Sequence, residues 1–357
     1  MNKAYIVLVA LGVLVLLGLF GTTAYVVSRD AATGTASYRL LPLSADRIIS
    51  FFNPFDGDAK EATSASAQSA LFTTLWFSDF SGDRIGAFDR DGNKVWEQHM
   101  GSPPIPSASY ATHTEYITVA PNGNLVVADG DGMMVQEIDR QTHGLVWQYG
   151  VKDIQGYSLG YLHQPDKSFK LNDHEVLIND GNNRRVIIVD QRTGDIVWQY
   201  GETLRMGSGP GLLRGNTSVR PVKEGTQFLI TDTLEKKVML VDRASQQIVK
   251  EWHTPNAKWI QHVWYTPAGT LVMEDRQKNE VFELGAEGHV LWTLTTLADG
   301  SALKYPTDVI KLTSGHVLIA EAGRNRIIEV NPQTKKLIKS YTGVGFVSTI
   351  VIDPEPI

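Results

Sequence analysis

Three histidines in the repeated part of the chain have side chains that could carry out chemistry together. His113, His163 and His262 each stand at the entrance to a predicted inner strand, so we expect all three to approach a central funnel from the same face. Imidazole exchanges protons and attacks electrophiles near neutral pH. The set could act as nucleophile and acid–base groups, or bind a metal, or give a water-filled channel a polar lining. Polar lining is favoured, because no His-x-x-x-His pair supports a metal site.

Equivalent segments of other repeats supply further polar and aromatic side chains to the same funnel, namely Arg220, Trp259, Tyr305 and Asp308. An acidic residue also ends each predicted second strand on this face, and the series is Asp79, Asp129, Asp180, Asp232, Asp275 and Glu321. Aspartates at such places usually bind backbone N–H groups of the adjoining loop. We predict that role for the series in preference to a ring of cation ligands.

These side chains are positioned by a repeat of six units. The third strands end at Asp89, Asp139, Asp190, Asp242, Leu284 and Asn331, with spacings of 50, 51, 52, 42 and 47 residues. A period of 40 to 50 residues with strand-like content is typical of a β-propeller. In one unit, YITVAP, LVVAD, MVQEID and LVWQY are the four strands, and Asn-Gly-Asn at 122–124 is a hairpin turn. Near-continuous Val, Ile and Leu in the middle strands indicate burial on both faces.

Four tryptophans occupy one repeating place on the outer strand, where a large ring can fill the gap between blades, and they are Trp96, Trp147, Trp198 and Trp292. The first unit lacks an inner strand, and the C-terminal FVSTIVIDPEP has the pattern of one. The C-terminus should therefore complete the first blade and close the ring, which removes exposed sheet edges. The predicted fold is all-β: a six-bladed propeller over residues 71–357, closed by a C-terminal strand and preceded by one N-terminal transmembrane helix.

The N-terminal segment AYIVLVALGVLVLLGLFGTTAYVV, residues 4–27, has no charge and is long enough to cross a bilayer. Its apolar run exceeds that of a secretory signal, the competing interpretation, and no convincing cleavage site follows it. We predict a retained anchor over residues 1–28 in the inner or cytoplasmic membrane. A single pass would put the propeller on the periplasmic or extracellular side.

A connector over residues 29–70 follows the anchor, and part of it is too apolar for a solvated tether. Something must cover its large side chains, among them Leu40, Leu41, Ile48, Ile49, Phe51, Phe52 and Phe55. The bilayer surface, the propeller or a partner protein could do so. The connector is therefore a predicted interaction segment, with other membrane proteins as the expected partners.

Bulk composition excludes several classes of function. The formal charge is -6, whereas a nucleic-acid-binding surface needs a basic face. There is no cysteine, so disulfides and zinc–thiolate sites are excluded. The segment GSGPG, residues 207–211, lacks the Lys-Ser/Thr ending of a phosphate loop, and no Gly-x-Ser-x-Gly elbow occurs. We predict no cofactor, no metal and no nucleic acid.

Two phrases of the sequence, VDQRTGDIVWQYG and EIDRQTHGLVWQYG, resemble the tryptophan-ended repeats of PQQ-type propellers, and GNNRRV and GRNRI resemble NHL-type loops. Residues 112–341 as a whole are similar to bacterial arylsulfotransferases, whose catalytic part is a six-bladed periplasmic propeller. That resemblance implies catalytic roles for His163 as the sulfuryl-carrying group and for His113, His262 and Arg276 around the funnel. The family's N-terminal β-domain is absent.

The sequence supports two main functions. The first is a membrane-anchored, non-catalytic interaction subunit of a larger membrane complex, such as a respiratory or photosynthetic one, and it follows from the anchor and the apolar connector. The second is an arylsulfotransferase-like enzyme that uses the funnel histidines. A periplasmic ligand-binding or sensor propeller is a further alternative.

Overall fold

The structure is a computed structural model that describes residues 72–100, 115–215 and 217–353, together with the backbone of four strands between residues 5 and 42. The chain forms two compact units, Met1–Gln68 and Ser69–Ile357. His113 and the connector residues from Ile48 to Phe55 lie outside the described residues.

The first unit contributes four antiparallel backbone strands paired in chain order, β1 (Tyr5–Ala10), β2 (Val13–Phe20), β3 (Thr23–Arg29) and β4 (Ala36–Pro42). Leu40 and Leu41 belong to β4. Within the described part of the chain, no helix is long and apolar enough to span a bilayer. Some positions of residues 4–27 lie outside the described residues, so the transmembrane helix there stays a prediction.

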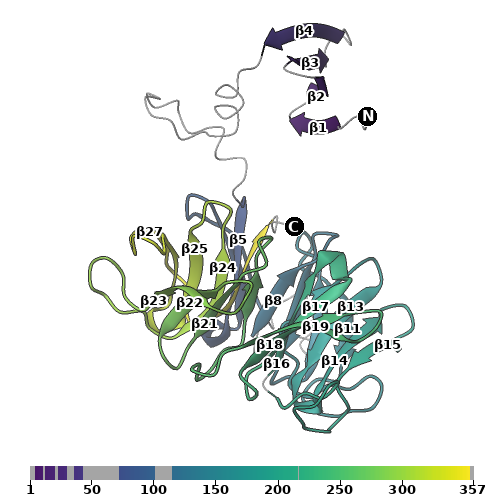
Figure 1. Ribbon diagram of the computed structural model, residues 1–357. Coiled ribbons are helices and arrows are strands. Elements are labelled where there is room, and N and C mark those ends of the chain that lie inside the picture. Colours follow the sequence, from purple (N-terminus) through teal and green to yellow (C-terminus); the bar gives the residue numbers. More distant parts are fainter. Residues whose placement is uncertain are drawn as a thin grey trace. The chain divides into compact units, whose positions relative to one another are not determined.

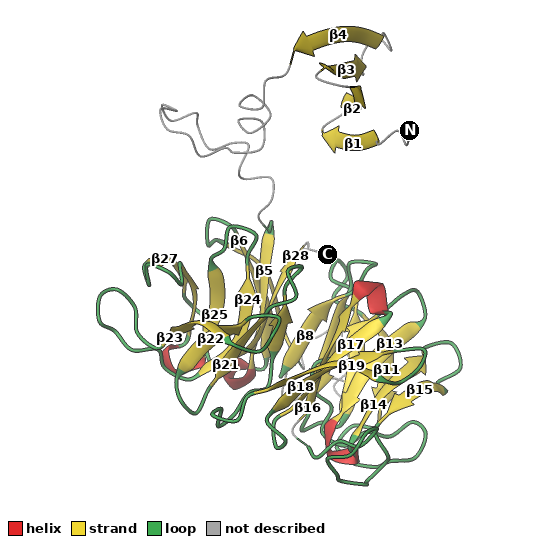
Figure 2. Ribbon diagram, in the orientation of Figure 1, coloured by secondary structure: helices red, strands yellow, loops and turns green. Residues whose placement is uncertain are grey.

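The second unit is a ring of six four-stranded antiparallel sheets, which confirms the predicted propeller (Figure 1; Figure 2). Blade 1 consists of β28 (Val347–Asp353), β5 (Thr74–Asp79), β6 (Arg84–Asp89) and β7 (Lys94–His99). Blade 2 consists of β8 (Tyr116–Val119), β9 (Leu125–Asp129), β10 (Met134–Ile138) and β11 (Leu145–Gly150). Blade 3 consists of β12 (Phe169–Lys170), β13 (Glu175–Asp180), β14 (Arg185–Asp190) and β15 (Ile196–Tyr200).

The other three blades follow the same order from the inner to the outer strand. Blade 4 consists of β16 (Thr217–Val222), β17 (Gln227–Asp232), β18 (Lys237–Asp242) and β19 (Ile248–His253). Blade 5 consists of β20 (Val263–Tyr265), β21 (Leu271–Asp275), β22 (Glu280–Leu284) and β23 (Val290–Leu294). Blade 6 consists of β24 (Pro306–Lys311), β25 (Val317–Glu321), β26 (Arg326–Val330) and β27 (Leu337–Tyr341). Short 3-10 turns lie in the hairpins at η2 (Phe80–Gly82), η3 (Gly181–Asn183), η4 (Lys223–Gly225) and η5 (Ala322–Arg324).

The ring closes through β28, as the terminal sequence pattern predicts. This strand pairs antiparallel with β5, and Val351 lies opposite Trp76 in the register. The inner strands of the last and first blades, β24 and β28, also lie against each other, as do β28 and β8. The first and last segments of the propeller are therefore joined by an antiparallel ladder, and the inner edge of β5 is covered by β28.

Middle strands are buried on both faces, as the continuous apolar runs predict. All six residues of β14 are buried, and Val186, Ile187 and Ile188 have no exposed surface. The core is divided among clusters that span neighbouring blades, because each sheet face packs on the next sheet. Turn predictions are also confirmed: Gly123 has φ +84° and His143, in the place of a turn glycine, has φ +61°.

The recurring tryptophan of the outer strand joins some of the blades to the turn of the next blade. The indole N–H of Trp96 donates to the carbonyl of Arg140 in the next blade at 2.8 Å, and Trp198 donates to Arg243 in the same way at 2.8 Å. Trp292 differs, because its N–H donates to Glu283 of its own blade at 2.5 Å. Trp96 and Trp198 therefore have two roles, because each ring fills the gap between blades and each indole N–H binds the neighbouring turn.

The tyrosine and glycine of the Trp-Gln-Tyr-Gly sequence organise the loop to the next blade. Tyr149 accepts a hydrogen bond at its hydroxyl from the N–H of Gly160 at 2.9 Å. Gly150 has φ +96°, and a Cβ there would lie 2.2 Å from the carbonyl oxygen of Met133, so only glycine fits. Gly201 repeats this with φ +93° and the same 2.2 Å approach to a backbone oxygen.

The loops at residues 151–165 and 201–215 are structural copies of each other. Each contains an isolated parallel bridge, Gln155 with Leu162 in the first loop and Met206 with Leu213 in the second. Both leucines are fully buried. A sequence that repeats Trp-Gln-Tyr-Gly therefore repeats the loop after it as well, and both loops lie on the funnel face of the ring.

Candidate functional site

Acidic residues at the ends of the second strands hold the loops of the funnel face in place, as predicted. Asp180, for example, accepts a hydrogen bond from the N–H of His163 at 2.8 Å and pairs with Arg185 at 2.7 Å. The other N–H groups bound in this way belong to Gly82 and Gly345 for Asp79, Gly132 for Asp129, Arg214 and Glu235 for Asp232, Lys258 and Trp259 for Asp275, and Lys304 for Glu321. The inter-blade loops are thus fixed around the funnel by buried carboxylates.

Two adjoining cavities form the mouth of the funnel, with volumes of about 220 and 110 Å³. They share four lining residues: Glu115, Tyr116, Gln261 and Arg276. The larger cavity continues along Gln164–Asp166, Asn179, Gly181, Asn182, Thr217 and Trp259, and the smaller one along Phe80, His262, Thr307, Phe346 and Ser348. All six blades therefore contribute residues to the mouth, and none of these residues lies on an outer strand.

A buried ion pair crosses the hub below the mouth. Lys167, which precedes β12, donates to Asp308 of β24 at 2.8 Å, and both side chains are at most 3% exposed. The second partner of the same Asp308 oxygen is the backbone N–H of Ile350 in β28, at 3.1 Å. Although burial opposes ionisation, Lys167 and His262 hold the pKa of Asp308 below its usual value. Blades 3, 6 and 1 therefore meet at one carboxylate.

His262 lies beside this ion pair in a fixed orientation. Its Nδ1 is 2.9 Å from the carbonyl oxygen of Thr307, so this nitrogen carries a proton, and its Nε2 is 3.5 Å from Asp166. Burial opposes protonation of the ring, but the charges of Asp308 and Asp166 outweigh it and raise the pKa of His262. Nε2 itself is buried and has no hydrogen-bond partner among the described residues. The ring thus presents Nε2 to Asp166, with its edge against Tyr116.

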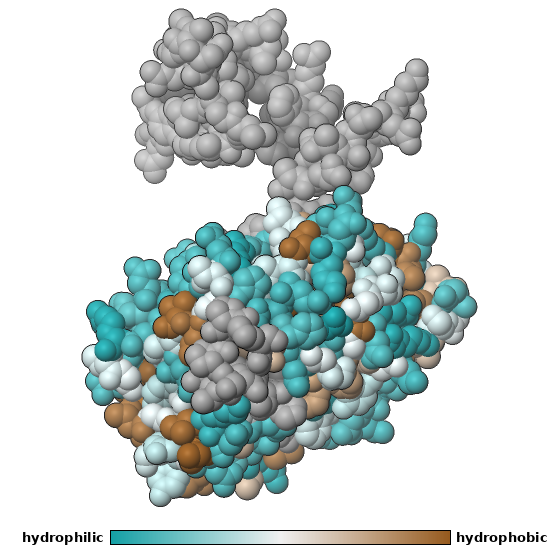
Figure 3. Space-filling model, turned by 180° about the vertical axis from the view of Figure 1, so that it is seen from behind, coloured by the Kyte–Doolittle hydropathy of each residue, from teal (hydrophilic) through white to brown (hydrophobic). Residues whose placement is uncertain are grey.

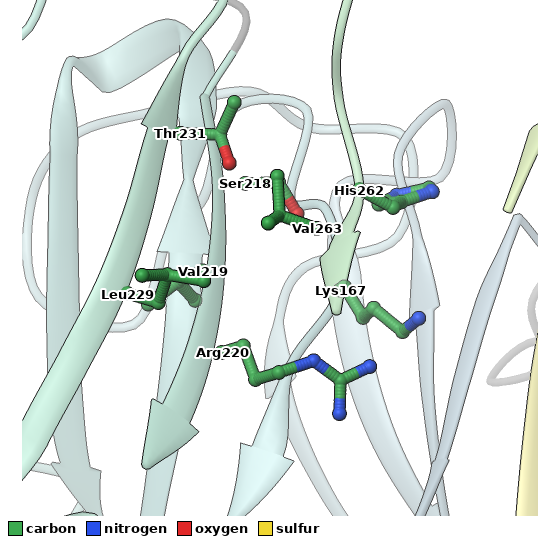
Figure 4. A pocket seen from close by; sticks show the side chains of 8 residues that line it. All are labelled: Lys167, Ser218, Val219, Arg220, Leu229, Thr231, His262 and Val263. Atoms are coloured by element: carbon green, nitrogen blue, oxygen red, sulfur yellow. The ribbon is translucent and has the colours of Figure 1, made fainter. Parts of the chain in front are cut away.

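Figure 4 shows the side chains that line a small space of about 10 Å³ deeper in the funnel. Lys167 and His262 extend in the same direction from neighbouring segments, and the guanidinium of Arg220 lies below them. Arg220 stacks on the ring of Trp264 at 4.4 Å and on Phe169 at 5.7 Å. Cationic groups therefore follow one another down the channel, each beside a carboxylate or an aromatic face.

Gln261 links the floor of the mouth to its wall. Its Nε2 donates to the hydroxyl of Tyr116 at 2.8 Å and to Asp166 at 2.5 Å. Because the Tyr116 oxygen accepts a hydrogen bond from Gln261, the O–H of Tyr116 points elsewhere. Tyr116 lines both cavities, so this O–H can donate to a molecule bound in them. Burial and the charge of Asp166 raise the pKa of Tyr116, so the phenol remains protonated.

Two glutamates near the funnel have strongly raised pKa values. Burial, reinforced by the charges of Asp166, Asp131 and Asp129, raises the pKa of Glu115 to about 8. Burial also raises the pKa of Glu274 to about 8, although His262 opposes the shift. Both carboxyls are therefore mainly neutral at pH 7, and each can then donate a hydrogen bond as well as accept one.

Arg276 stands at the mouth between aromatic rings. Its guanidinium lies 4.7 Å from the ring centroid of Trp259 and 6.0 Å from that of Tyr305. Trp259 and Arg276, both half-buried, line the larger cavity, and Tyr305 is exposed at the rim. In the described part of the chain Arg276 has no hydrogen bond or ion pair to a side chain. Its edge N–H groups are thus available to whatever enters the mouth.

The predicted site residues are brought together only in part. His262, Arg276, Trp259, Arg220 and Asp308 line the funnel or its hub, as expected, whereas His113 lies outside the described residues. His163 falls one residue before the segment that lines the larger cavity. Its Nε2 is 3.4 Å from the side-chain nitrogen of Asn182.

Several residues of the mouth were not among the sequence predictions, namely Glu115, Tyr116, Asp166, Lys167, Gln261 and Glu274. A partial signal was present for three of them, because Glu115 and Tyr116 directly follow the His113 segment and Gln261 directly precedes His262. For the Lys167–Asp308 pair there was none, since 141 residues separate the two.

Comparison with known proteins now assigns the repeat. The sequence matches the family model described as outer membrane protein assembly factor BamB over residues 81–249 and again over residues 182–343. The chain belongs to this family. The two overlapping matches fit the internal repetition of a BamB-type propeller, in which adjoining blades satisfy the same pattern. No curated protein matches the sequence.

Solved structures with a similar fold have diverse names. A protein of unknown function from Bacteroides caccae has 13% identity and a TM-score of 0.55, over 78% of this chain and 98% of that one. Hydrazine synthase of Kuenenia stuttgartiensis has 16% identity and a TM-score of 0.51, over 76% and 84% of the two chains. Virginiamycin B lyase from Staphylococcus aureus has 12% identity and a TM-score of 0.50, over 75% and 80%. At such identities the likeness concerns the fold alone.

Proposed function

We propose that this BamB-type propeller is a membrane-anchored, non-catalytic interaction subunit of a larger membrane protein assembly. The propeller would stand on the periplasmic or extracellular side of the inner or cytoplasmic membrane, held there by the anchor predicted over residues 4–27. Family membership supports the proposal, because the family is described by an assembly factor of outer membrane proteins. The predicted apolar connector supports it too.

One surface feature carries the proposal. The loops at 151–165 and 201–215 and the neighbouring β17–β18 hairpin expose seven large apolar side chains, which we call the apolar rim: Val151, Ile154, Tyr157, Leu159, Leu204, Met206 and Leu234. Tyr157, Leu159 and Met206 are each 57% exposed. The space-filling view shows brown apolar groups gathered in separate places on an otherwise hydrophilic surface (Figure 3).

One hairpin links the two loops that carry most of the apolar rim. Asn183, in η3, donates from its side chain to the carbonyl of Gly156 at 2.7 Å and accepts at its own carbonyl from Leu204 at 2.8 Å. On the far side, Arg214 pairs with Glu235 at 2.9 Å, next to Leu234. Large apolar side chains exposed on adjoining loops are typical of sites of protein–protein contact.

Exposed valines elsewhere on the ring have a different distribution. Val95, Val146, Val197 and Val249 are each 51–54% exposed, but each lies on the outer strand of a different blade. Single exposed apolar residues are normal on soluble proteins. These valines are thus matched controls for the apolar rim, equal in exposure and separate in position.

The proposal is tested with the intact chain isolated from membranes under mild detergent. We expect the wild-type protein to migrate as part of a complex, and we expect the triple variant Tyr157→Ser, Leu159→Ser, Leu204→Ser to lose at least tenfold of the co-purifying partner relative to the bait. The loss of two or three buried apolar side chains from an interface is large enough for this.

The control is Val95→Ser, Val197→Ser, Val249→Ser, which should keep the partner. Migration of the wild-type protein as a lone monomer would refute the proposal, and so would equal partner recovery from the two triple variants. Circular dichroism of both variants confirms that the propeller is folded.

The arylsulfotransferase-like activity stays a prediction that no observation of the funnel favours. Nε2 of His262 faces Asp166. The backbone N–H of His163 donates to Asp180, and its ring Nε2 lies near the side chain of Asn182. Sulfuryl transfer from an aryl sulfate to a phenol that His163→Ala abolishes would support it.

A further inference from the structure

The funnel mouth has an aromatic wall along one side. Phe80 and Phe346 meet edge to face with centroids 6.2 Å apart, and Phe346 contacts Tyr305 at 5.8 Å. Trp259 continues the wall beyond Arg276. Apart from Tyr305, these residues line the two cavities. Such a wall offers flat apolar faces to a ring-shaped ligand.

Besides the aromatic wall, the cavities are lined by groups that donate and groups that accept hydrogen bonds. Donors are the guanidinium of Arg276 and the Tyr116 hydroxyl, and acceptors are the carboxylate of Asp166 and the side-chain oxygens of Asn182 and Gln261. Glu115 can do both while it is protonated. A bound molecule must therefore carry donors and acceptors side by side.

Charge at the mouth argues against an anionic ligand. Asp166 lines the larger cavity, and burial together with the charges of Asp166, Asp131 and Asp129 raises the pKa of Glu115. An anion that entered the mouth would be repelled by the same aspartates. A cation would meet Arg276, which already covers the face of Trp259. The site favours a neutral polar molecule.

We propose that the funnel mouth binds the neutral pyranose ring of a sugar, with its hydroxyls on Arg276, Asp166 and Tyr116 and its C–H face on the aromatic wall. Vicinal hydroxyls supply adjacent donors and acceptors without charge, and axial C–H groups of a pyranose pack on aromatic rings. The volumes of about 220 and 110 Å³ lie below or near the lower end of drug-sized sites, so they fit a single ring or the end of a glycan.

Sugar binding does not depend on the interaction role proposed above. The apolar rim consists of loop tips and the sugar site of funnel residues, and the two sets share no residue. Variants of one site therefore leave the other intact, and failure of either proposal is seen separately.

The experiment uses the full-length protein in detergent and titrates it with neutral, anionic and cationic probes. The neutral probes are glucose, galactose, N-acetylglucosamine and chitotriose, in which chitotriose separates a glycan end from a free monosaccharide. Benzoate and phenyl sulfate are the anions, and benzylamine is the cation. Saturation-transfer NMR detects contact, and calorimetry gives the dissociation constant. We expect binding of at least one neutral sugar, with weaker or no binding of the charged probes.

Two variants locate the binding. Arg276→Met keeps the length of the side chain and removes its donors, and it should weaken sugar binding by about tenfold or more, the value of one charged hydrogen bond. Arg205→Met is the control, because Arg205 is exposed on the 201–215 loop and pairs with Glu202 at 2.7 Å. It should leave affinity unchanged.

Three results would overturn the proposal: binding of benzoate, phenyl sulfate or benzylamine in preference to all sugars, absence of sugar binding at millimolar concentrations, or sugar binding that Arg276→Met does not weaken. Asp166→Asn gives an independent reading, since it keeps the shape and removes the charge. If Arg276→Met fails to fold, sugar affinity of Asp166→Asn decides, and an unchanged affinity counts against the site.

Discussion

Replacing Lys167 by methionine tests whether the hub ion pair holds the ring together. Methionine keeps most of the aliphatic stem and removes the ammonium group that lies 2.8 Å from Asp308. Asp308 would then be buried as an unpaired carboxylate in Lys167→Met. In the wild type, burial raises the pKa of Asp308, but the charge of Lys167 holds it below its usual value. Without Lys167 this pKa would rise.

The expected cost follows from what remains around the carboxylate. Removing one partner of a buried ion pair destabilises a protein by about 3–5 kcal/mol. Here Asp308 keeps the N–H groups of Ile350 at 3.1 Å and of Val309 at 2.9 Å, and His262 lies 4.0 Å away. We therefore expect a value near the lower end, about 3 kcal/mol.

Urea unfolding monitored by tryptophan fluorescence measures the change at pH 7 and again at pH 5. Destabilisation by Lys167→Met should shrink at the lower pH, because protonation of Asp308 removes the unpaired charge. The double variant Lys167→Met, Asp308→Leu should recover part of the loss, since both charges are then gone. Arg205→Met, in an exposed pair, should cost less than about 1 kcal/mol.

A Lys167→Met protein within about 1 kcal/mol of wild type at pH 7 would refute the view that the hub depends on this pair, and so would a destabilisation that does not shrink at pH 5. A double variant less stable than the single one would refute it as well. In that case the stability of the hub would come from the apolar clusters between the blades.

Three further changes test other parts of the ring. Tyr149→Phe removes the hydrogen bond to Gly160 and should cost about 1 kcal/mol, with faster amide exchange confined to residues 151–165; unchanged exchange there contradicts the role. Gly150→Ala should destabilise far more than Gly160→Ala in thermal unfolding, because the new Cβ meets a backbone oxygen at 2.2 Å in the first and open space in the second; equal losses contradict this. Glu274 has a pKa raised by burial from 4.5 to about 8, so the folded protein keeps a proton that the unfolded chain loses, and stability should fall between those pH values by roughly 1.4 kcal/mol per unit. Glu274→Gln should flatten that fall, and an unchanged urea midpoint profile would contradict it.

Local pattern was enough to predict the blades. Near-continuous apolar strands, turn glycines and the terminal FVSTIVIDPEP segment are short-range features, and each is set by physics within one hairpin or one strand pair. Asp180 and its equivalents were also predictable, because an aspartate at a strand end binds the nearest loop N–H groups. Asp180 and most of its equivalents bind N–H groups within about twenty positions of themselves, whereas Asp79 also accepts from the distant Gly345 where the ring closes.

The centre of the funnel could not be predicted in the same way. Lys167 and Asp308 come from opposite sides of the ring, and nothing in either neighbourhood of the sequence indicates the other. A glutamate within a strand, such as Glu274 in β21, is usually expected to face solvent. Glu274 is nevertheless buried, because both faces of the sheet are covered by neighbouring blades. Such contacts are decided by how the blades close around the axis.

Closure by β28 also imposes an order on biogenesis. β5 is among the first propeller strands to be synthesised, and the partner that covers its inner edge is the last. Until residues 347–353 leave the ribosome, that edge is an open template for any extended chain nearby. A nascent propeller would need protection at this one strand, and a chain that stopped before Val347 would leave the template exposed for good.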